Sequence, residues 1–422
     1  MAIDSEVLNP PGQPKTLAEE LRRGTARRGI GAAVIMNITS RLLGSAATLI
    51  AVSGARAADA VTVAEPEPTE YVKICDVYGA GYFYIPGTET CLRIGGYVRY
   101  DIGLGDVGSY DPARTFVRTG KDQGTWRNNT RFTFKTWTGQ ETELGALKTY
   151  SETLMNFGNR NAYLGPDSPQ NNAFNTGLTL TSAWIQLGGL RVGKDESAFD
   201  TFIGYAGNVL NQFPVPYGDF DTSVVQYYFD ASNGFSAVGS LEGGSGVVGT
   251  IDSYVPHVVG GVKYTQGWGA ITGVGAYDSN YESVAGKVRV DVNVTSGLSL
   301  FGMFGYGANG KLNDDSTKAI DAHRRGFYKI WGGNWAFWAG ASYKFNETTS
   351  FNLQVSGDQL KNYGLAANVA YTVVPGFTVT AELDYDHYSD FGVGMVGPSN
   401  VNWTATDKKD SVGGILRFQS SF

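Results

Sequence analysis

The feature that most constrains this chain is a run of about ten residues with alternating apolar and polar side chains, repeated along most of its length. Between Lys287 and Thr295 four valines alternate with charged or polar residues, and the segments 335–345 and 377–386 follow the same rule. A period of two places one kind of side chain on each face of a β-strand. The pattern predicts an all-β chain of two-faced strands.

The connections between these runs alternate in length. Short turn signals join some neighbours, at 188–189, 232–234, 296–297, 346–348 and 375–376. Long connections join others, at 105–125, 195–222, 244–256, 308–334 and 389–410. Tight turns at one end and long loops at the other are typical of a transmembrane antiparallel β-barrel of the outer-membrane type.

Sixteen strands are expected, and an even number near sixteen makes a barrel wide enough for an aqueous channel. The ranges are 92–104, 126–138, 141–153, 177–188, 190–195, 223–231, 235–243, 257–265, 268–278, 285–296, 298–307, 335–345, 349–358, 363–374, 377–388 and 411–422.

The alternative all-β architecture is one or two soluble, secreted sandwiches, whose apolar faces would cover a core. Aromatic side chains near the strand ends favour the membrane barrel, because barrels carry aromatic girdles at both interfaces. The last strand also ends on Phe422, as the carboxy-terminal signal of outer-membrane barrels does. The barrel is therefore the preferred fold.

Composition agrees with this fold and excludes several functions. Charged residues make up 17% of the chain, glycine 57 of 422 residues, and the net charge is −7. A negative net charge argues against a nucleic-acid partner. Three histidines and two cysteines leave little material for metal or thiol chemistry. No stretch beyond residue 60 is long and apolar enough for a transmembrane helix.

The N-terminal region reads as a targeting segment. Residues 36–57 resemble a signal peptide, with a basic start, an apolar stretch too short to span a bilayer, and a small-x-small cleavage site at Ala55–Ala57. Residues 1–35 are then an upstream extension outside the mature protein, with Met36 as the start; a long amino-terminal region of the signal is the alternative. The mature chain would consist of a segment 58–91 and the barrel 92–422.

The only cysteines, Cys75 and Cys91, lie sixteen residues apart. In an oxidising compartment they can bridge, which stabilises by about 3 kcal/mol in the chain-entropy model. Two buried free thiols are the alternative.

The segment Tyr71–Tyr100 closely resembles the mature N-terminus of alphaproteobacterial general porins, in its cysteine pair, its Ile85-Pro-Gly-Thr88 turn and the strand opening Cys91-Leu-Arg-Ile-Gly-Gly96. A looser likeness continues to Phe422. The resemblance implies a 16-stranded, homotrimeric outer-membrane porin whose third external loop folds into the lumen. It also implies passive diffusion of ions and small hydrophilic solutes, with no cofactor.

A candidate constriction loop is 195–222, which follows the fifth strand. It is acidic, and it contains apolar residues suited to packing against an inner wall; a solvated external loop is the alternative. Its carboxylates are Asp195, Glu196, Asp200, Asp219 and Asp221.

Opposite this loop we expect a basic pore wall on the polar faces of the first strands. Arg or Lys facing lipid at mid-membrane costs roughly 2–4 kcal/mol, so these side chains should point inward. The predicted wall residues are Arg93, Arg99, Arg127, Arg131, Lys135, Lys148 and Arg191.

No arrangement of side chains predicts catalysis or a metal site, so no enzyme activity, metal or cofactor is expected. The expected partners are outer-membrane lipid and lipopolysaccharide, other copies of the chain, and diffusing solutes and ions. Two alternatives remain: a substrate-selective channel for a sugar or similar nutrient, with Tyr205, Tyr217, Trp184 and Trp338 as stacking residues, and a closed barrel that serves as a surface anchor.

Overall fold

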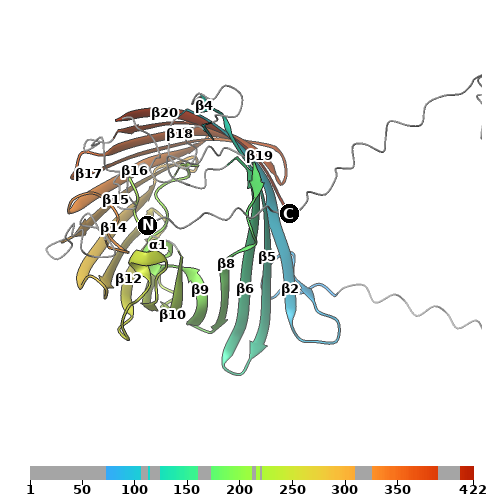
Figure 1. Ribbon diagram of the computed structural model, residues 1–422. Helices are drawn as coiled ribbons and strands as arrows, with labels where there is room; N and C mark the ends of the chain where they lie inside the picture. Colours follow the sequence, from blue (N-terminus) through green and yellow to red (C-terminus); the bar gives the residue numbers. More distant parts are fainter. Residues whose placement is uncertain are drawn as a thin grey trace, which may run out of the picture. The chain divides into compact units, whose positions relative to one another are not determined.

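The computed structural model describes residues 73–105, 113–114, 124–159, 173–211, 215–218, 221–308, 326–387 and 409–422. Sixteen long strands close into an antiparallel barrel, which confirms the predicted fold class and strand number (Figure 1). They are β2 (Cys91–Gly105), β5 (Arg127–Thr142), β6 (Gly145–Gly158), β8 (Thr179–Leu187), β9 (Leu190–Glu196), β10 (Asp221–Asp230), β11 (Phe235–Glu242), β12 (His257–Gln266), β13 (Gly269–Asp278), β14 (Ser283–Asn293), β15 (Leu298–Gly307), β16 (Trp335–Lys344), β17 (Thr349–Asp358), β18 (Tyr363–Val374), β19 (Phe377–His387) and β20 (Asp410–Ser421).

The remaining described elements are short. Four strands have two residues each: β1 (Phe83–Tyr84), β3 (Ala113–Arg114), β4 (Gly124–Thr125) and β7 (Phe174–Asn175). Two helices, α1 (Ala198–Thr201) and α2 (Gly246–Gly249), lie in long connections. Among the residues that the structure describes, no helix has the length and apolar character needed to span a membrane.

The barrel closes between its first and last long strands. Tyr100 of β2 is the register partner of Phe418 of β20, and Phe422 exchanges backbone hydrogen bonds with Gly96. Every other long strand pairs with its neighbour along the chain. Closure leaves no open sheet edge, which a barrel in lipid requires.

The two faces of the barrel wall are inverted relative to a soluble sandwich. In β19, Leu383 and Tyr385 are exposed, whereas Glu382, Asp384 and Asp386 are buried. The apolar side chains of the strands thus form the outer surface, and the polar ones lie on the other face, which we call the polar face. This distribution excludes the sandwich alternative and is the one that lipid selects.

One hairpin lies away from its predicted position. The sequence suggested a turn between 138 and 141, but β5 runs to Thr142 and β6 starts at Gly145, so the turn is at Glu143–Leu144. Gly139 has another role: the Tyr78 ring lies on it, and a Cβ there would be 2.5 Å from a ring carbon.

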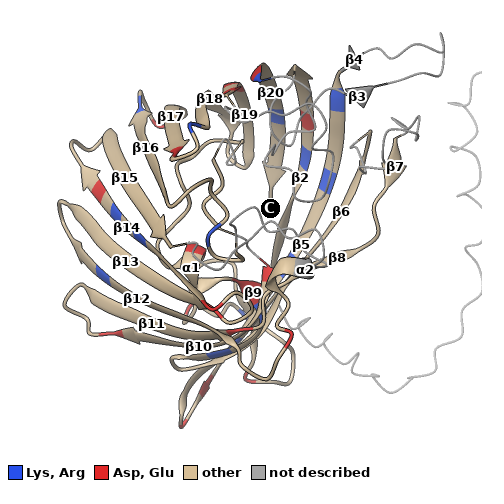
Figure 2. Ribbon diagram, turned by 60° about the vertical axis from the view of Figure 1, so that its left-hand side comes forward, with Lys and Arg blue, Asp and Glu red and all other residues tan. Residues whose placement is uncertain are grey.

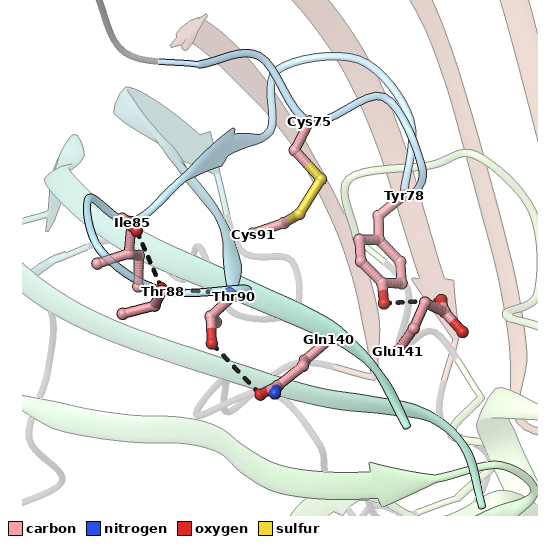
Figure 3. The surroundings of a disulfide bond; sticks show 8 residues. All are labelled: Cys75, Tyr78, Ile85, Thr88, Thr90, Cys91, Gln140 and Glu141. Atoms are coloured by element: carbon pink, nitrogen blue, oxygen red, sulfur yellow. Dashed lines mark hydrogen bonds between the residues drawn. A yellow bond between two sulfur atoms is a disulfide. The ribbon is translucent and has the colours of Figure 1, made fainter. Parts of the chain in front are cut away.

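The segment before the barrel is held by a disulfide between Cys75 and Cys91, which confirms the predicted bridge (Figure 3). Within this loop the Tyr78 hydroxyl donates to Glu141 at 2.8 Å. Burial, followed by this hydrogen bond, raises the pKa of Tyr78 to about 12. The expected extension 1–35 and signal peptide 36–57 lie outside the described residues.

Candidate functional site

The strand register places all seven bases of the predicted pore wall on the polar face. Directly paired residues of neighbouring strands project to the same side. Arg99 pairs with Arg131, Lys135 with Glu152, and Lys148 with Gln186, which in turn pairs with Arg191. Arg93 and Arg127 share the parity of these residues in β2 and β5. Figure 2 shows the basic positions along these strands.

Several of these bases are tied to acids or amides on the same face. Arg99 and Arg417 both bind Asp101, with nitrogen–oxygen distances of 3.1 and 2.7 Å. Lys135 lies 3.0 Å from Glu152, and Arg131 donates to Asn156 at 2.8 Å. Alternating charges across adjacent strands thus hold these long side chains against the wall.

Three further bases lie on aromatic rings. The Arg93 guanidinium is 4.4 Å from the centroid of Trp137, and that of Arg191 is 4.0 Å from the centroid of Trp184. The Lys148 ammonium lies 5.8 Å from the ring of Tyr78. Such stacking is a favourable cation–π arrangement.

The five predicted loop carboxylates occupy different places. Asp195 and Glu196 are the last residues of β9, and Asp221 begins β10. Asp195 binds Arg191 at 2.6 Å and Asp221 binds Lys194 at 2.5 Å, whereas Glu196 accepts a hydrogen bond from Tyr205. Asp219 lies outside the described residues. Only Asp200 lies in the described part of the connection between the two strands.

Asp200 forms a buried ion pair that the sequence did not reveal. Its carboxylate lies 2.5 Å from the Lys287 ammonium, and both side chains are almost inaccessible. Lys287, on the polar face of β14, also donates to the Tyr217 carbonyl at 2.7 Å. The base that binds Asp200 therefore comes from β14, not from the predicted wall. The one sequence signal for Lys287 was its place among the polar positions of the alternating run 287–295.

The connection between β9 and β10 makes further contacts with the polar face. We call its described residues, 197–211 and 215–218, the third-loop segment. Glu382 of β19 accepts from the backbone amides of Leu210 and Asn211, each at 2.6 Å. Trp338 of β16 donates to the Val215 carbonyl at 2.6 Å. The segment is thereby bonded to strands far from those that carry it.

The beginning of the segment is fixed by Glu242 at the end of β11. This carboxylate accepts from the Ser197 hydroxyl at 2.7 Å and from the Ala198 amide at 3.0 Å. It also accepts from the hydroxyl of Tyr328, in the connection between β15 and β16. Burial raises the pKa of the Tyr328 phenol above its ordinary value, so it remains a donor. One carboxylate thus joins two long connections.

Comparison with known proteins agrees with this architecture. The model of the Porin subfamily matches residues 59–415. Porin Omp2b of Brucella canis is 46% identical over 396 residues, covering 92% of this chain and all of that protein, and Porin Omp2b of Brucella abortus shows the same identity and coverage.

Two solved structures share the fold at low identity. The outer-membrane channel DcaP of Acinetobacter baumannii superimposes with a TM-score of 0.52 at 14% identity, covering 80% of this chain and 99% of DcaP. An anion-selective porin from Comamonas acidovorans gives 0.50 at 15% identity, covering 79% and 100%. With the closed barrel and its polar face, these matches show that the chain belongs to the porin family and is a channel protein of the bacterial outer membrane.

Proposed function

We propose that the polar face lines a water-filled channel through which ions and small hydrophilic solutes diffuse passively. The observation that carries this proposal is the inversion of the barrel wall. Polar and charged side chains, such as Arg99, Lys135 and Glu382, share one face, and the apolar side chains of the strands share the other. Charged residues at this density need water, and a closed barrel of this size encloses it. The outer face would contact lipid and lipopolysaccharide.

We further propose that the third-loop segment folds into the lumen and narrows it. Its hydrogen-bond partners Lys287, Trp338 and Glu382 lie on three different strands, β14, β16 and β19, and all belong to the polar face. A loop extending outward from the rim could not reach them. The bases on β2, β5 and β6 would form the opposite wall of the opening.

A homotrimer is the third element of the proposal. On the outer face, Thr136 and Ser151 lie 2.7 Å apart, and Thr138 and Thr149 lie 2.6 Å apart. Hydroxyl pairs are a poor surface for lipid but a good one for a protein neighbour, as in other membrane interfaces. We therefore assign the contact between copies to β5 and β6.

The channel is tested by single-channel recording of the refolded mature protein in a planar bilayer. We expect large ohmic steps arriving in threes, and a salt gradient in the same cell gives the ion preference. A protein shown to be folded and inserted but without conductance would contradict the channel. Steps that occur singly and never in groups of three would contradict the trimer.

The loop position is tested by cross-linking. The Asn208 side chain donates to the Ser342 hydroxyl at 2.9 Å, so N208C with S342C should form a disulfide. The matched control is N208C with S299C, because Ser299 is the register partner of Ser342 in β15. We expect efficient cross-linking of the first pair and unchanged conductance after it. Failure of that pair to cross-link would place the loop elsewhere.

A further inference from the structure

Three aromatic rings form a row on the polar face of adjacent strands. Trp137 of β5, Tyr150 of β6 and Trp184 of β8 are successive register partners. Their ring centroids lie 5.4 and 5.6 Å apart, with tilts of 35° and 41° between neighbouring planes. The rings thus continue from strand to strand as one platform, three residues from the short-turn end of β8.

Each outer ring of the row is held by an arginine. Arg93 lies over Trp137, whose ring also lies close to the backbone of Gly95, where a Cβ would be 3.1 Å away. Arg191 lies over Trp184 and donates to Gln186 and Asp195, which fix its guanidinium. The outer rings are therefore ordered before any solute arrives, and Tyr150 occupies the centre between them.

The row is not part of the packed interior. The buried apolar cluster contains aromatic residues of the third-loop segment and of 327–338, including Tyr217 and Trp338, both with no exposed surface. Trp137, Tyr150 and Trp184 are outside this cluster and remain half-buried. They also lie on the face away from lipid. Neither core packing nor a membrane girdle accounts for them.

Polar groups surround the platform at its edges. The Tyr150 hydroxyl donates to Glu152, which also binds Lys135, and the Lys148 ammonium is next along the same face of β6. An apolar ring face bordered by carboxylate, amide and ammonium groups matches a pyranose, which has an apolar C–H face and a rim of hydroxyls. Sites that bind small molecules combine aromatic lining with a few placed polar groups in this way.

We propose that this platform is a saccharide subsite, in which a pyranose ring stacks on Tyr150 and its hydroxyls bind Glu152 and Lys148. The inference rests on the proposed channel, because a solute reaches this face only through the lumen. The subsite would retain neutral oligosaccharides briefly during their passage, in addition to passive diffusion. Of the stacking residues expected from the sequence, Trp184 belongs to it, whereas Tyr217 and Trp338 are buried.

The test is a titration of open-channel current with maltotriose. A polyethylene glycol of equal hydrodynamic radius, which fills volume but has no pyranose ring, is the solute control. We expect saturable reduction of the wild-type current by maltotriose and a linear effect of the polymer. Tyr150→Ala should raise the half-blocking concentration about tenfold, whereas Tyr150→Phe, which keeps the ring, should stay near wild type.

Tyr227→Ala is the matched protein control, since Tyr227 lies on the outer face with 58% of its surface exposed. It should leave the block unchanged. Equal block by the two solutes, or equal block of wild type and Tyr150→Ala, would overturn the subsite while the conductance itself still supports the channel.

Intrinsic tryptophan emission provides a readout that does not need a conducting variant. Maltotriose should change the wild-type emission saturably, and Trp184→Phe should remove part of that change. An emission spectrum unaffected by maltotriose would overturn the proposal even if Tyr150→Ala failed to fold.

Discussion

The Lys287 ammonium lies 2.5 Å from the Asp200 carboxylate, and the two residues are 87 positions apart in the chain. Lys287 is on β14, and Asp200 is in α1, which begins after Ser197 caps it by accepting from the Phe199 amide. This pair joins a long connection to a strand that neither precedes nor follows it. Together with the bonds from Glu242, Trp338 and Glu382, it holds the third-loop segment against the polar face.

Replacing the base of this pair should destabilise the barrel strongly. In Lys287→Met the Asp200 carboxylate is left buried without its counter-charge, which typically costs about 3–5 kcal/mol. We expect a lower temperature of thermal unfolding in detergent, followed by circular dichroism. The double variant Lys287→Met, Asp200→Asn should regain most of the loss, because a neutral pair needs no counter-charge. A single variant as stable as wild type would contradict the role of this pair.

Glu382→Gln should loosen the third-loop segment rather than the barrel. Glu382 accepts from Leu210, Asn211 and the Asn368 side chain, and hydrogen bonds to a charged acceptor contribute about 1.5–3 kcal/mol each. An amide has one acceptor oxygen and cannot replace both carboxylate oxygens. We expect larger fluctuations of the open-channel current. Glu347→Gln, in an exposed turn, is the control, and its open-channel current should fluctuate no more than that of wild type.

Asp384→Asn should stabilise the protein. Asp384 is buried between the acidic side chains of Glu382 and Asp386, so three acidic groups crowd one part of the polar face. Replacing the central acid by an amide removes its unfavourable interaction with the other two and should raise stability by about 1–3 kcal/mol, measured as a higher unfolding temperature. Asp101→Asn is the control with the opposite expected result. It should lower the unfolding temperature, since it would break the ion pairs with Arg99 and Arg417. The same direction of change in both variants would refute the explanation.

Ionisation of the Tyr78 phenol should lower the stability of the folded protein at alkaline pH. Its pKa is raised to about 12 in the folded protein from 10.0, mainly by burial and then by the bond to Glu141. A raised pKa gives stability that is complete below pH 10 and is lost as the pH rises through 12. Among the late-ionising tyrosines of the wild type, spectrophotometric titration at alkaline pH should show one that is absent from Tyr78→Phe. An unchanged titration curve in the variant would exclude Tyr78 as that group.

The sequence alone was sufficient to predict the barrel. Alternation with a period of two identified the sixteen strands and placed Arg131, Lys135 and Arg191 on one face, because successive side chains of any strand point to opposite sides. Turn residues located most of the hairpins. The turn expected between 138 and 141 was wrong because alternation marks the two faces of a strand but not the residue at which the strand ends, and β5 continues to Thr142.

The tertiary structure alone decided which residues of distant segments meet on the polar face. The partners of the third-loop segment, Lys287, Trp338 and Glu382, are between 70 and 172 residues distant from their contacts. The row of Trp137, Tyr150 and Trp184 likewise exists only in the register of three strands. Alternation specifies the face of a side chain, which is a local property. The partner of that side chain in a distant segment depends on strand stagger and on the path of a loop, and these are fixed only when the whole barrel closes.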